Sequence, residues 1–235
     1  MWLFYTPDVL TDMELPQEEA GHCIRVLRMK EGDRIRLADG KGCFYDAVIS
    51  AVSGKRCMVH VTGREPQQPL WNGHLHIAVA PTKLMDRNEW FVEKAVEIGV
   101  SEITFIDTDH SERDCIKMER IEKIAVSAMK QSQKATLPLL SGMTPFRELV
   151  EGGFDGDRFI AHCEPGQKQH LMDALVPGHN AMVLIGPEGD FSPAEIELAL
   201  KAGFKPVSLG DSRLRTETAA LAAVHMMNLA ARIRQ

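Results

Sequence analysis

No run of apolar residues in this 235-residue chain approaches the roughly 20 residues that a membrane-spanning helix needs. The segment Met1–Asp8 lacks the positive start and the apolar core of a secretory signal peptide. The five cysteines form no Cys-x-x-Cys pair, and their odd number and scatter argue against a disulfide framework and against a zinc site. The histidines also lack metal-ligand spacing. These absences predict a protein of the reducing cytoplasm that uses neither a membrane nor a metal.

The composition is that of an ordinary soluble globular protein, with 44% hydrophobic and 26% charged residues. The length fits one large domain or two small ones. The net charge of −6 gives no hint of nucleic acid, but the charge is distributed unevenly. Between Gly21 and Arg64, nine basic residues stand against four acidic ones, which leaves +5 there and −11 elsewhere. This asymmetry favours a basic module joined to an acidic one, although a solvated sheet surface accounts for it equally well.

The first part of the chain contains short predicted strands at close spacing, which is typical of a small barrel. Alternation of polar and apolar residues predicts a strand over 34–38. A glycine-containing turn then leads to strands over 43–49 and 57–61. We predict a short helix over 16–27, and the polar, proline-bearing segment 65–69 suits a linker.

Beyond the linker, apolar strands alternate with helices, which predicts an α/β domain with a parallel sheet covered on both faces. Gly99 and Gly203 each stand where a helix should end. We expect strands at 75–80, 103–106, 158–161, 182–185 and 207–209, and helices at 88–98, 116–133, 193–202 and 218–233.

Two of these strands end in glycine-bearing turns that run directly into helices. The first turn is the Gly-Pro-Glu-Gly segment 186–189, and the helix after it starts at 192–195. Ser192 is a favourable cap, Pro193 suits the first helical position, and Glu195 can complete a capping box. The glycines allow either close approach of a ligand or a positive φ angle. A plain strand-to-helix connection is the alternative interpretation.

The second turn begins at Leu209 and places two cations, one anion and two hydroxyls within residues 213–218. A threonine can cap the last helix, and the helix dipole favours Glu217 in its first turn. Neither effect accounts for Arg213 and Arg215, because positive charge is unfavourable at a helix N-terminus. Residues that break a local rule tend to be functional, so the two arginines indicate a ligand site.

No Gly-x-Gly-x-x-Gly motif follows a strand, which disfavours a Rossmann-type methyltransferase or dehydrogenase. The two turns, at 186–189 and 214–219, instead resemble the signature of the SPOUT class of S-adenosylmethionine-dependent RNA methyltransferases. More closely, the chain resembles the family of ribosomal RNA small subunit methyltransferase E, which methylates N3 of a single uridine in 16S rRNA. That resemblance covers nearly the whole chain and includes segments 26–33, 39–42, 93–100 and 111–113.

The resemblance implies an α/β fold in two domains. Residues 1–70 would form a PUA-like β-barrel that binds RNA, and residues 71–235 a SPOUT domain with a parallel sheet and a deep trefoil knot. It also implies a cytoplasmic homodimer, S-adenosyl-L-methionine as the cofactor, and 16S rRNA of the small ribosomal subunit as the partner. Neutral uracil carries a proton on N3, so the reaction needs a general base or a cation that stabilises the resulting charge.

The resemblance also assigns the site residues. Arg215 is the candidate for charge stabilisation, and Glu217 is the candidate base, although a role at the helix start accounts for Glu217 as well. The residues expected to bind RNA are basic, namely Arg25, Arg28, Lys30, Arg113 and Lys134. The residues expected to hold the cofactor are His162, Ile185, Gly186, Pro187, Glu188, Gly189, Leu209, Gly210, Leu214, Arg215, Thr216, Thr218 and Ala219.

Two positions depart from the family pattern. Relatives often have glycine where this chain has Asp190, and a common Gln-x-x-Arg pattern here ends in Lys134, which lacks the planar fork of arginine. Two other functions stay open. One is a SPOUT methyltransferase with another RNA target, such as tRNA, and the other is a non-catalytic RNA-binding factor of ribosome assembly. The intact run 215–218 argues against the second.

Overall fold

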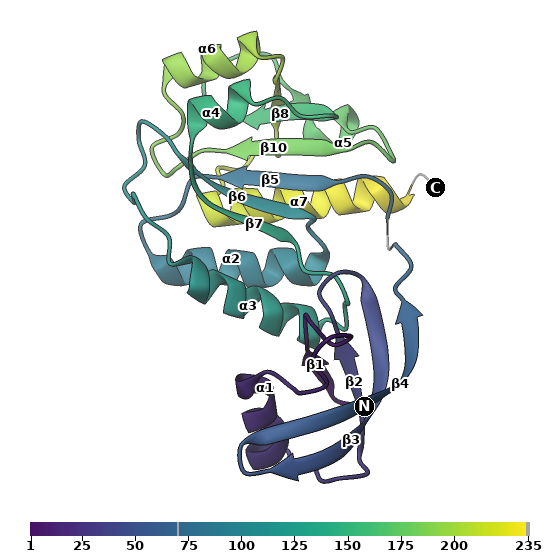
Figure 1. Ribbon diagram of the computed structural model, residues 1–235. Helices are drawn as coiled ribbons and strands as arrows, with labels where there is room; N and C mark the ends of the chain where they lie inside the picture. Colours follow the sequence, from purple (N-terminus) through teal and green to yellow (C-terminus); the bar gives the residue numbers. More distant parts are fainter. Residues whose placement is uncertain (70, 234–235) are drawn as a thin grey trace. The chain divides into compact units, whose positions relative to one another are not determined.

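A computed structural model describes residues 1–69 and 71–233 of the chain (Figure 1). The chain folds into two compact units, each built from two stretches of sequence. The first unit comprises Met1–Gln68 and Val126–Leu137, and the second comprises Pro69–Ala125 and Pro138–Gln235. None of the described helices has the length and apolar character that crossing a bilayer requires.

A four-stranded sheet forms the framework of the first unit. Its strands follow one another in sequence order, the first pair being parallel and the other two pairs antiparallel. All three predicted strands are confirmed. The last strand is longer than predicted and runs into segment 65–69, because the hairpin pairing continues there, so the linker prediction is wrong for its first two residues. The strands are β1 (Leu3–Tyr5), β2 (Arg34–Ala38), β3 (Cys43–Ser53) and β4 (Arg56–Pro66).

A helical segment and a later stretch of the chain complete the first unit. The predicted helix is divided into α1 (Gln17–Gly21) and a π-helical turn, η1 (His22–Val26). Residues 126–137 attach through hydrogen bonds, since Ala135 N–H donates to Gln67 Oε1 (2.8 Å) and Ala135 O accepts from Gly42 N–H (3.0 Å). The buried side chains of this unit include Phe4, Ile35, Leu37, Tyr45 and Ile49.

The second unit is built on a seven-stranded sheet in which all neighbouring strands are parallel. The sheet type predicted from the near-continuous apolar strands is therefore confirmed. The five predicted strands are present, and two more lie at the edges of the sheet. In spatial order the strands are β7 (Leu139–Pro145), β6 (Glu102–Asp107), β5 (Leu75–Val79), β10 (Ala181–Ile185), β8 (Asp157–Ala161), β11 (Lys205–Ser208) and β9 (Gln169–His170).

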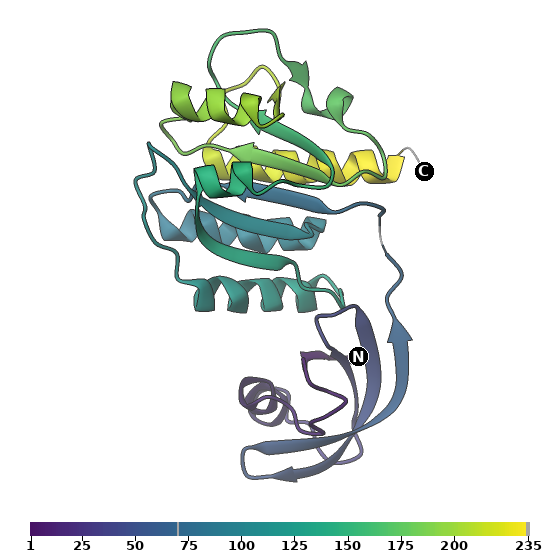
Figure 2. The ribbon, with the colours of Figure 1, turned by 45° about the horizontal axis from the view of Figure 1, so that its top comes forward.

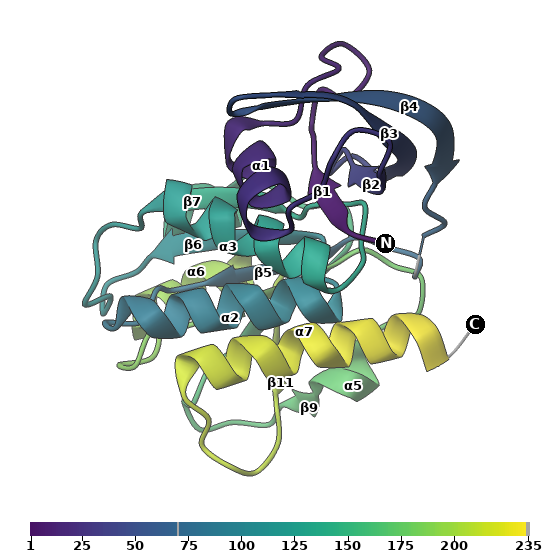
Figure 3. The same ribbon diagram turned by 90° about the horizontal axis from the view of Figure 1, so that it is seen from below.

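Helices cover both faces of this sheet, as predicted. On one face, α2 (Met85–Ile98) and α7 (Thr216–Ile233) lie side by side (Figure 3). On the other face lie α4 (Phe146–Glu151) and α6 (Pro193–Lys201) (Figure 2). The glycine predicted to end α2, Gly99, has a left-handed φ of 115°. The remaining helices are α3 (Met118–Gln131), whose last residues belong to the first unit, and α5 (Leu171–Ala174).

The strand order brings three loops to one edge of the sheet. Strands β10, β8 and β11 are parallel neighbours, so the chain leaves all three at the same edge. The loops that follow them are 186–192, 162–168 and 209–215. Ligands of α/β proteins bind in crevices at the carboxyl ends of such strands. Both glycine-bearing turns therefore lie where a ligand site is expected.

Candidate functional site

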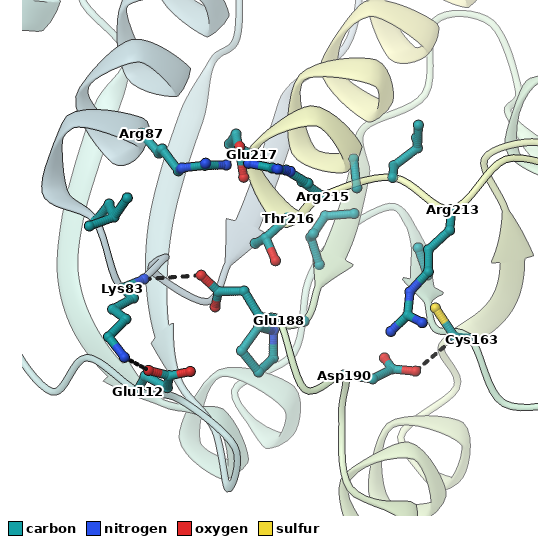
Figure 4. A pocket seen from close by; sticks show the side chains of 17 residues that line it. Lys83, Arg87, Glu112, Cys163, Glu188, Asp190, Arg213, Arg215, Thr216 and Glu217 are labelled. Carbon is teal, nitrogen blue, oxygen red and sulfur yellow. Dashed lines mark hydrogen bonds and ion pairs between the residues drawn. The ribbon is translucent and has the colours of Figure 1, made fainter.

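Two adjoining cavities lie at this edge of the second unit, with volumes of about 530 Å³ and 440 Å³. The larger one is drawn in Figure 4 and lies between the loop after β10 and the start of α7. The smaller one lies between the loops after β8 and β11. Both volumes are typical of small-molecule sites. The residues that line both cavities are Ala161, Cys163, Arg213, Leu214 and Ala219.

Helix α6 begins as predicted, and its start anchors the loop 186–192. Ser192 Oγ accepts from Glu195 N–H (3.3 Å) and Glu195 Oε2 accepts from Ser192 N–H (2.8 Å), which completes the capping box. Ser192 Oγ also donates to Asp109 Oδ2 (2.6 Å) in the loop after β6. Asp109 N–H donates in return to Glu195 Oε1 (2.9 Å). The helix start is thus tied to a neighbouring loop.

Further contacts hold the loop 186–192 along its length. Lys83 N–H, after β5, donates to Glu188 Oε1 (3.1 Å). His110 Nδ1–H donates to two carbonyl oxygens of the loop, at 3.2 and 2.9 Å. The buried Phe191 ring packs against Phe146, with ring centroids 5.4 Å apart. Contacts with three neighbouring segments therefore give this loop a defined shape.

The glycines of the first turn lie close to other residues of the protein. Neither Gly186 nor Gly189 has a positive φ, so that possibility is wrong for this turn. A Cβ atom on Gly186 would lie 3.1 Å from the Phe191 ring, and one on Gly189 would lie 3.1 Å from His110 Cβ. In the second turn the reason differs, because Gly210 has a φ of 124° and open space around it.

The loop 209–215 forms fewer hydrogen bonds than the loop 186–192. Ser208 Oγ accepts from Gly210 N–H (3.1 Å), and Arg215 O accepts from Ala219 N–H (2.8 Å) at the start of α7. Arg213 and Arg215 are exposed, and among residues 1–69 and 71–233 neither guanidinium has a carboxylate within ion-pair distance. Two positive charges without a carboxylate partner beside a cavity suit an anionic group or a group that becomes negative.

The candidate base Glu217 is already paired. Its carboxylate forms an ion pair with Arg87 of α2, and Figure 4 shows the two side chains facing each other. Glu217 is only 9% exposed. The carboxylate therefore already has a partner within the protein, on a neighbouring helix. The geometry therefore favours the structural role of Glu217 at the helix start.

The two cavities bring together most of the residues predicted to hold the cofactor. Gly189 and Thr218 line neither cavity, whereas both candidate catalytic residues line the larger one. The predicted residues that line at least one cavity are His162, Ile185, Gly186, Pro187, Glu188, Leu209, Gly210, Leu214, Arg215, Thr216 and Ala219. Lining residues absent from the prediction include Lys83, Leu84, Arg87, Glu112 and Asp190.

The sequence carried a usable signal for part of this missing set. Lys83 and Leu84 follow the predicted strand 75–80 closely, and parallel strands end at one edge of a sheet. Lys83 Nζ pairs with Glu112 Oε2 at 2.8 Å, so charges from two loops meet at the cavity (Figure 4).

His162, which was predicted to hold the cofactor, lines the smaller cavity. Burial lowers the pKa of its imidazole, and the nearby positive charge of Lys168 lowers it further. The imidazole is therefore neutral at neutral pH.

The residues predicted to bind RNA are divided between the two units. Arg113 belongs to the second unit, where its guanidinium donates to the carbonyl oxygens of Thr82 (3.2 Å) and Lys83 (2.5 Å) and so supports the loop after β5. RNA binding by these residues stays a prediction. Those of the first unit are Arg25, Arg28 and Lys30, all exposed, and the half-buried Lys134.

Comparison with known proteins defines the class. Residues 69–228 match the RNA methyltransferase domain, and residues 15–61 match the RNA methyltransferase PUA domain. The first match alone spans more than half of the chain, so the chain belongs to the RNA methyltransferase family.

The particular relatives carry one name. The chain is 28% identical to Ribosomal RNA small subunit methyltransferase E of Bacillus subtilis, over 88% of this chain and 86% of the relative. It is 26% identical to the protein of the same name from Rickettsia conorii, over 92% and 89%. The resemblance predicted from the two turns is confirmed.

Solved structures agree with this placement. A probable rRNA-methyltransferase from Porphyromonas gingivalis is 48% identical, with a TM-score of 0.96 and full coverage of both chains. Ribosomal RNA small subunit methyltransferase E from Neisseria gonorrhoeae, bound to S-adenosyl methionine, is 28% identical, with a TM-score of 0.86 over 97% of this chain and 96% of that one. A putative methyltransferase from Legionella pneumophila, in complex with SAM, is 29% identical, with a TM-score of 0.88 over 97% of each chain.

Proposed function

We propose that this chain is an S-adenosyl-L-methionine-dependent methyltransferase that methylates N3 of one specific uridine in 16S rRNA of the small ribosomal subunit. The observation that carries the proposal is the cavity between the loop after β10 and the start of α7 in a chain of the RNA methyltransferase family. The names of the relatives support the substrate, and the two similar structures with bound cofactor support the cofactor.

The residues around the cavities fit the cofactor. Ile185, Leu209 and Leu214 offer apolar surface to the adenine ring, and the backbone of 186–189 and Gly210 offers donors and acceptors to its polar edges. S-adenosyl-L-methionine supplies the methyl group when bound. The loops after β8, β10 and β11 would shape the space around it.

Arg215 is the residue that we assign to the chemistry. Uracil N3 loses its proton to solvent when it is methylated, and the negative charge that forms spreads to the two neighbouring carbonyl oxygens. An exposed guanidinium at the cavity, with no carboxylate partner among the described residues, can stabilise that charge. Glu217 is occupied by Arg87, so its part in the proposal is to fix the start of α7. The uridine has to be unpaired, because N3 lies on its pairing edge.

We further propose the finer features of the fold and assembly. Residues 1–70 would close as a PUA-like barrel, and residues 71–235 would carry the knotted SPOUT domain; the boundary, residue 70, lies outside the described residues. A homodimer in the cytoplasm, where ribosomal subunits are available, completes the proposal.

One experiment separates this function from its alternatives. The protein is incubated with labelled S-adenosyl-L-methionine and small subunits that lack the modification, and the labelled base is mapped. Label on uridine N3 of 16S rRNA supports the proposal. Label on tRNA offered in parallel would indicate another RNA target, and binding of subunits without any methyl transfer would indicate a non-catalytic factor.

The RNA-binding part of the proposal has its own test. The double variant Arg25→Ala/Arg28→Ala removes two exposed charges, so RNA affinity should fall about tenfold and its salt dependence should flatten by roughly 0.7–0.9 per lost phosphate contact. Cofactor affinity should not change. The control variant Arg147→Ala/Lys201→Ala removes the same charge from exposed helical positions of the second unit. Equal losses of RNA and cofactor affinity in the first variant would contradict the division of labour.

A further inference from the structure

Asp190 adopts a backbone conformation that favours glycine. Its φ is 62°, in the left-handed region, where most residues with a side chain are strained. Aspartate tolerates this region better than most, yet glycine would adopt it without cost. The position lies in the loop after β10, and the half-buried side chain lines the larger cavity. A carboxylate at such a position calls for a reason in its contacts.

The contacts of this carboxylate join two loops. Asp190 Oδ2 accepts from the backbone N–H of Cys163 (2.7 Å), in the loop after β8. Asp190 Oδ1 accepts from the backbone N–H of Phe191 (2.8 Å), in its own loop. Figure 4 shows the link between Asp190 and Cys163 at one corner of the cavity. Each oxygen thus serves one loop, and both hydrogen bonds are charge-assisted.

The place of this link gives it a function. Cys163 lines both cavities, so the Asp190–Cys163 bond lies where the two adjoin. It also connects the well-anchored loop after β10 with the loop after β8, which carries His162. If the link is absent, the loop after β8 keeps its strand but loses this tie to its neighbour.

We propose that Asp190 is a positioning residue for the cofactor, which holds the loops after β8 and β10 at the separation that the cofactor needs. The inference rests on the proposed function for the identity of the ligand. It assigns Asp190 no contact with the reacting atoms. The side chain acts through the backbone of Cys163, so its loss should weaken cofactor binding and leave the chemical step nearly intact.

Two substitutions separate the side chain from the backbone conformation. Asp190→Gly keeps the left-handed conformation and removes both acceptors. Asp190→Asn also tolerates that conformation but offers one acceptor oxygen, so one N–H loses its partner. Glu197→Gln is the matched control, because Glu197 is an exposed carboxylate of α6 whose ion pair, with Lys201 at 2.6 Å, stays within the helix.

The test measures binding of S-adenosyl-L-methionine to the whole protein by calorimetry, together with kcat, KM and amide hydrogen exchange. Asp190→Gly should raise Kd and the cofactor KM about tenfold, consistent with lost charge-assisted hydrogen bonds. It should change kcat by less than about twofold and speed exchange at the Cys163 amide. Asp190→Asn should lie between Asp190→Gly and the wild type, and Glu197→Gln should match the wild type.

The outcomes distinguish this inference from the proposed function. An unchanged Kd in Asp190→Gly would overturn the positioning role, whatever happens to thermal stability. A fall in kcat with unchanged KM would overturn it as well, because that pattern belongs to a group acting on the transition state. If the wild type binds the cofactor but does not methylate 16S rRNA, the proposed substrate fails and the role of Asp190 stands. If the wild type binds no cofactor, both fail.

Discussion

The loops after β10 and β11 border adjoining cavities but are built in different ways. The loop 186–192 is bonded to the segments after β5, β6 and β8, and it ends in a capping box. Among the described residues, the loop 209–215 forms hydrogen bonds only at its own ends, and its two arginines are exposed. The loop 186–192 is therefore held in a defined shape, whereas the loop 209–215 places two positive charges beside the cavities. The difference suggests that the fold fixes the shape of the site on one side and leaves the reactive groups on the other.

The largest expected effect tests whether the loop 209–215 carries the residue that promotes methyl transfer. Arg215→Ala should lower kcat about 100-fold or more, because it removes a positive charge placed where negative charge develops. The melting temperature should stay within a degree or two, since the guanidinium has no ion pair among the described residues. Rates under saturating cofactor and rRNA measure the first effect, and calorimetric scans measure the second.

Arg147→Ala provides the comparison for Arg215→Ala, because Arg147 is exposed on α4 and pairs with Glu151 of the same helix (2.9 Å). Its rate should equal that of the wild type. Unchanged activity in Arg215→Ala would show that Arg215 takes no part in the mechanism. It would also show that the loop 209–215 does not supply the reactive group through this residue.

A pH change tests the stability of the sheet from which both loops extend. His76 is 3% exposed near the start of β5, and burial lowers its pKa to about 4. The unfolded chain takes up the proton near pH 6.5, so stability present above that pH is lost as the pH falls from 6.5 towards 4. The difference corresponds to about 3 kcal/mol. Urea unfolding measured at intervals across this range should show the decline.

His76→Gln isolates this contribution. Glutamine does not titrate and can keep the hydrogen bond that His76 Nε2 makes with Thr104 Oγ1 at 2.9 Å. The variant should lose less stability than the wild type between pH 6.5 and 4. Parallel curves for the two proteins would show that His76 does not carry the acid sensitivity.

The smallest expected effect concerns the capping box at the end of the loop 186–192. Ser192→Ala removes the cap of α6 and the hydrogen bond to Asp109, which should cost about 1 kcal/mol of stability, with a range of 0.5–2 kcal/mol for caps. Ser127→Ala, at an exposed position within α3, should cost nothing. Urea midpoints measure both. If the two variants unfold alike, the capping box contributes little and the loop is held by its other contacts.

Much of the second unit could be predicted from local sequence. The apolar runs specify its central strands, and Ser192 with Pro193 specifies the start of α6. The edge strand β7 escaped prediction because it combines half-exposed residues with Gly142 and Pro145 and has no clear alternation. Periodicity identifies an element when one face is buried, and edge strands lack that signal.

The site was predictable in its loops and less so in its contacts. The sequence indicated a ligand site at the turns 186–189 and 209–218, and the family resemblance indicated S-adenosyl-L-methionine as the cofactor. It did not reveal that Arg87 occupies the carboxylate of Glu217, because the two residues are 130 positions apart and meet only through the packing of α2 on α7. The function of a carboxylate depends on its partner, and that partner comes from tertiary structure.

The membership of residues 126–137 in the first unit has a consequence for dissecting the molecule. The two units alternate along the chain, so no single cut separates them. A fragment that starts after the β-rich region would carry residues 126–137 without Gln67 and Gly42, the hydrogen-bond partners of Ala135. A fragment that stops there would lack the same stretch of its own unit. Exchange of one unit for that of a relative therefore requires three junctions, at 68/69, 125/126 and 137/138.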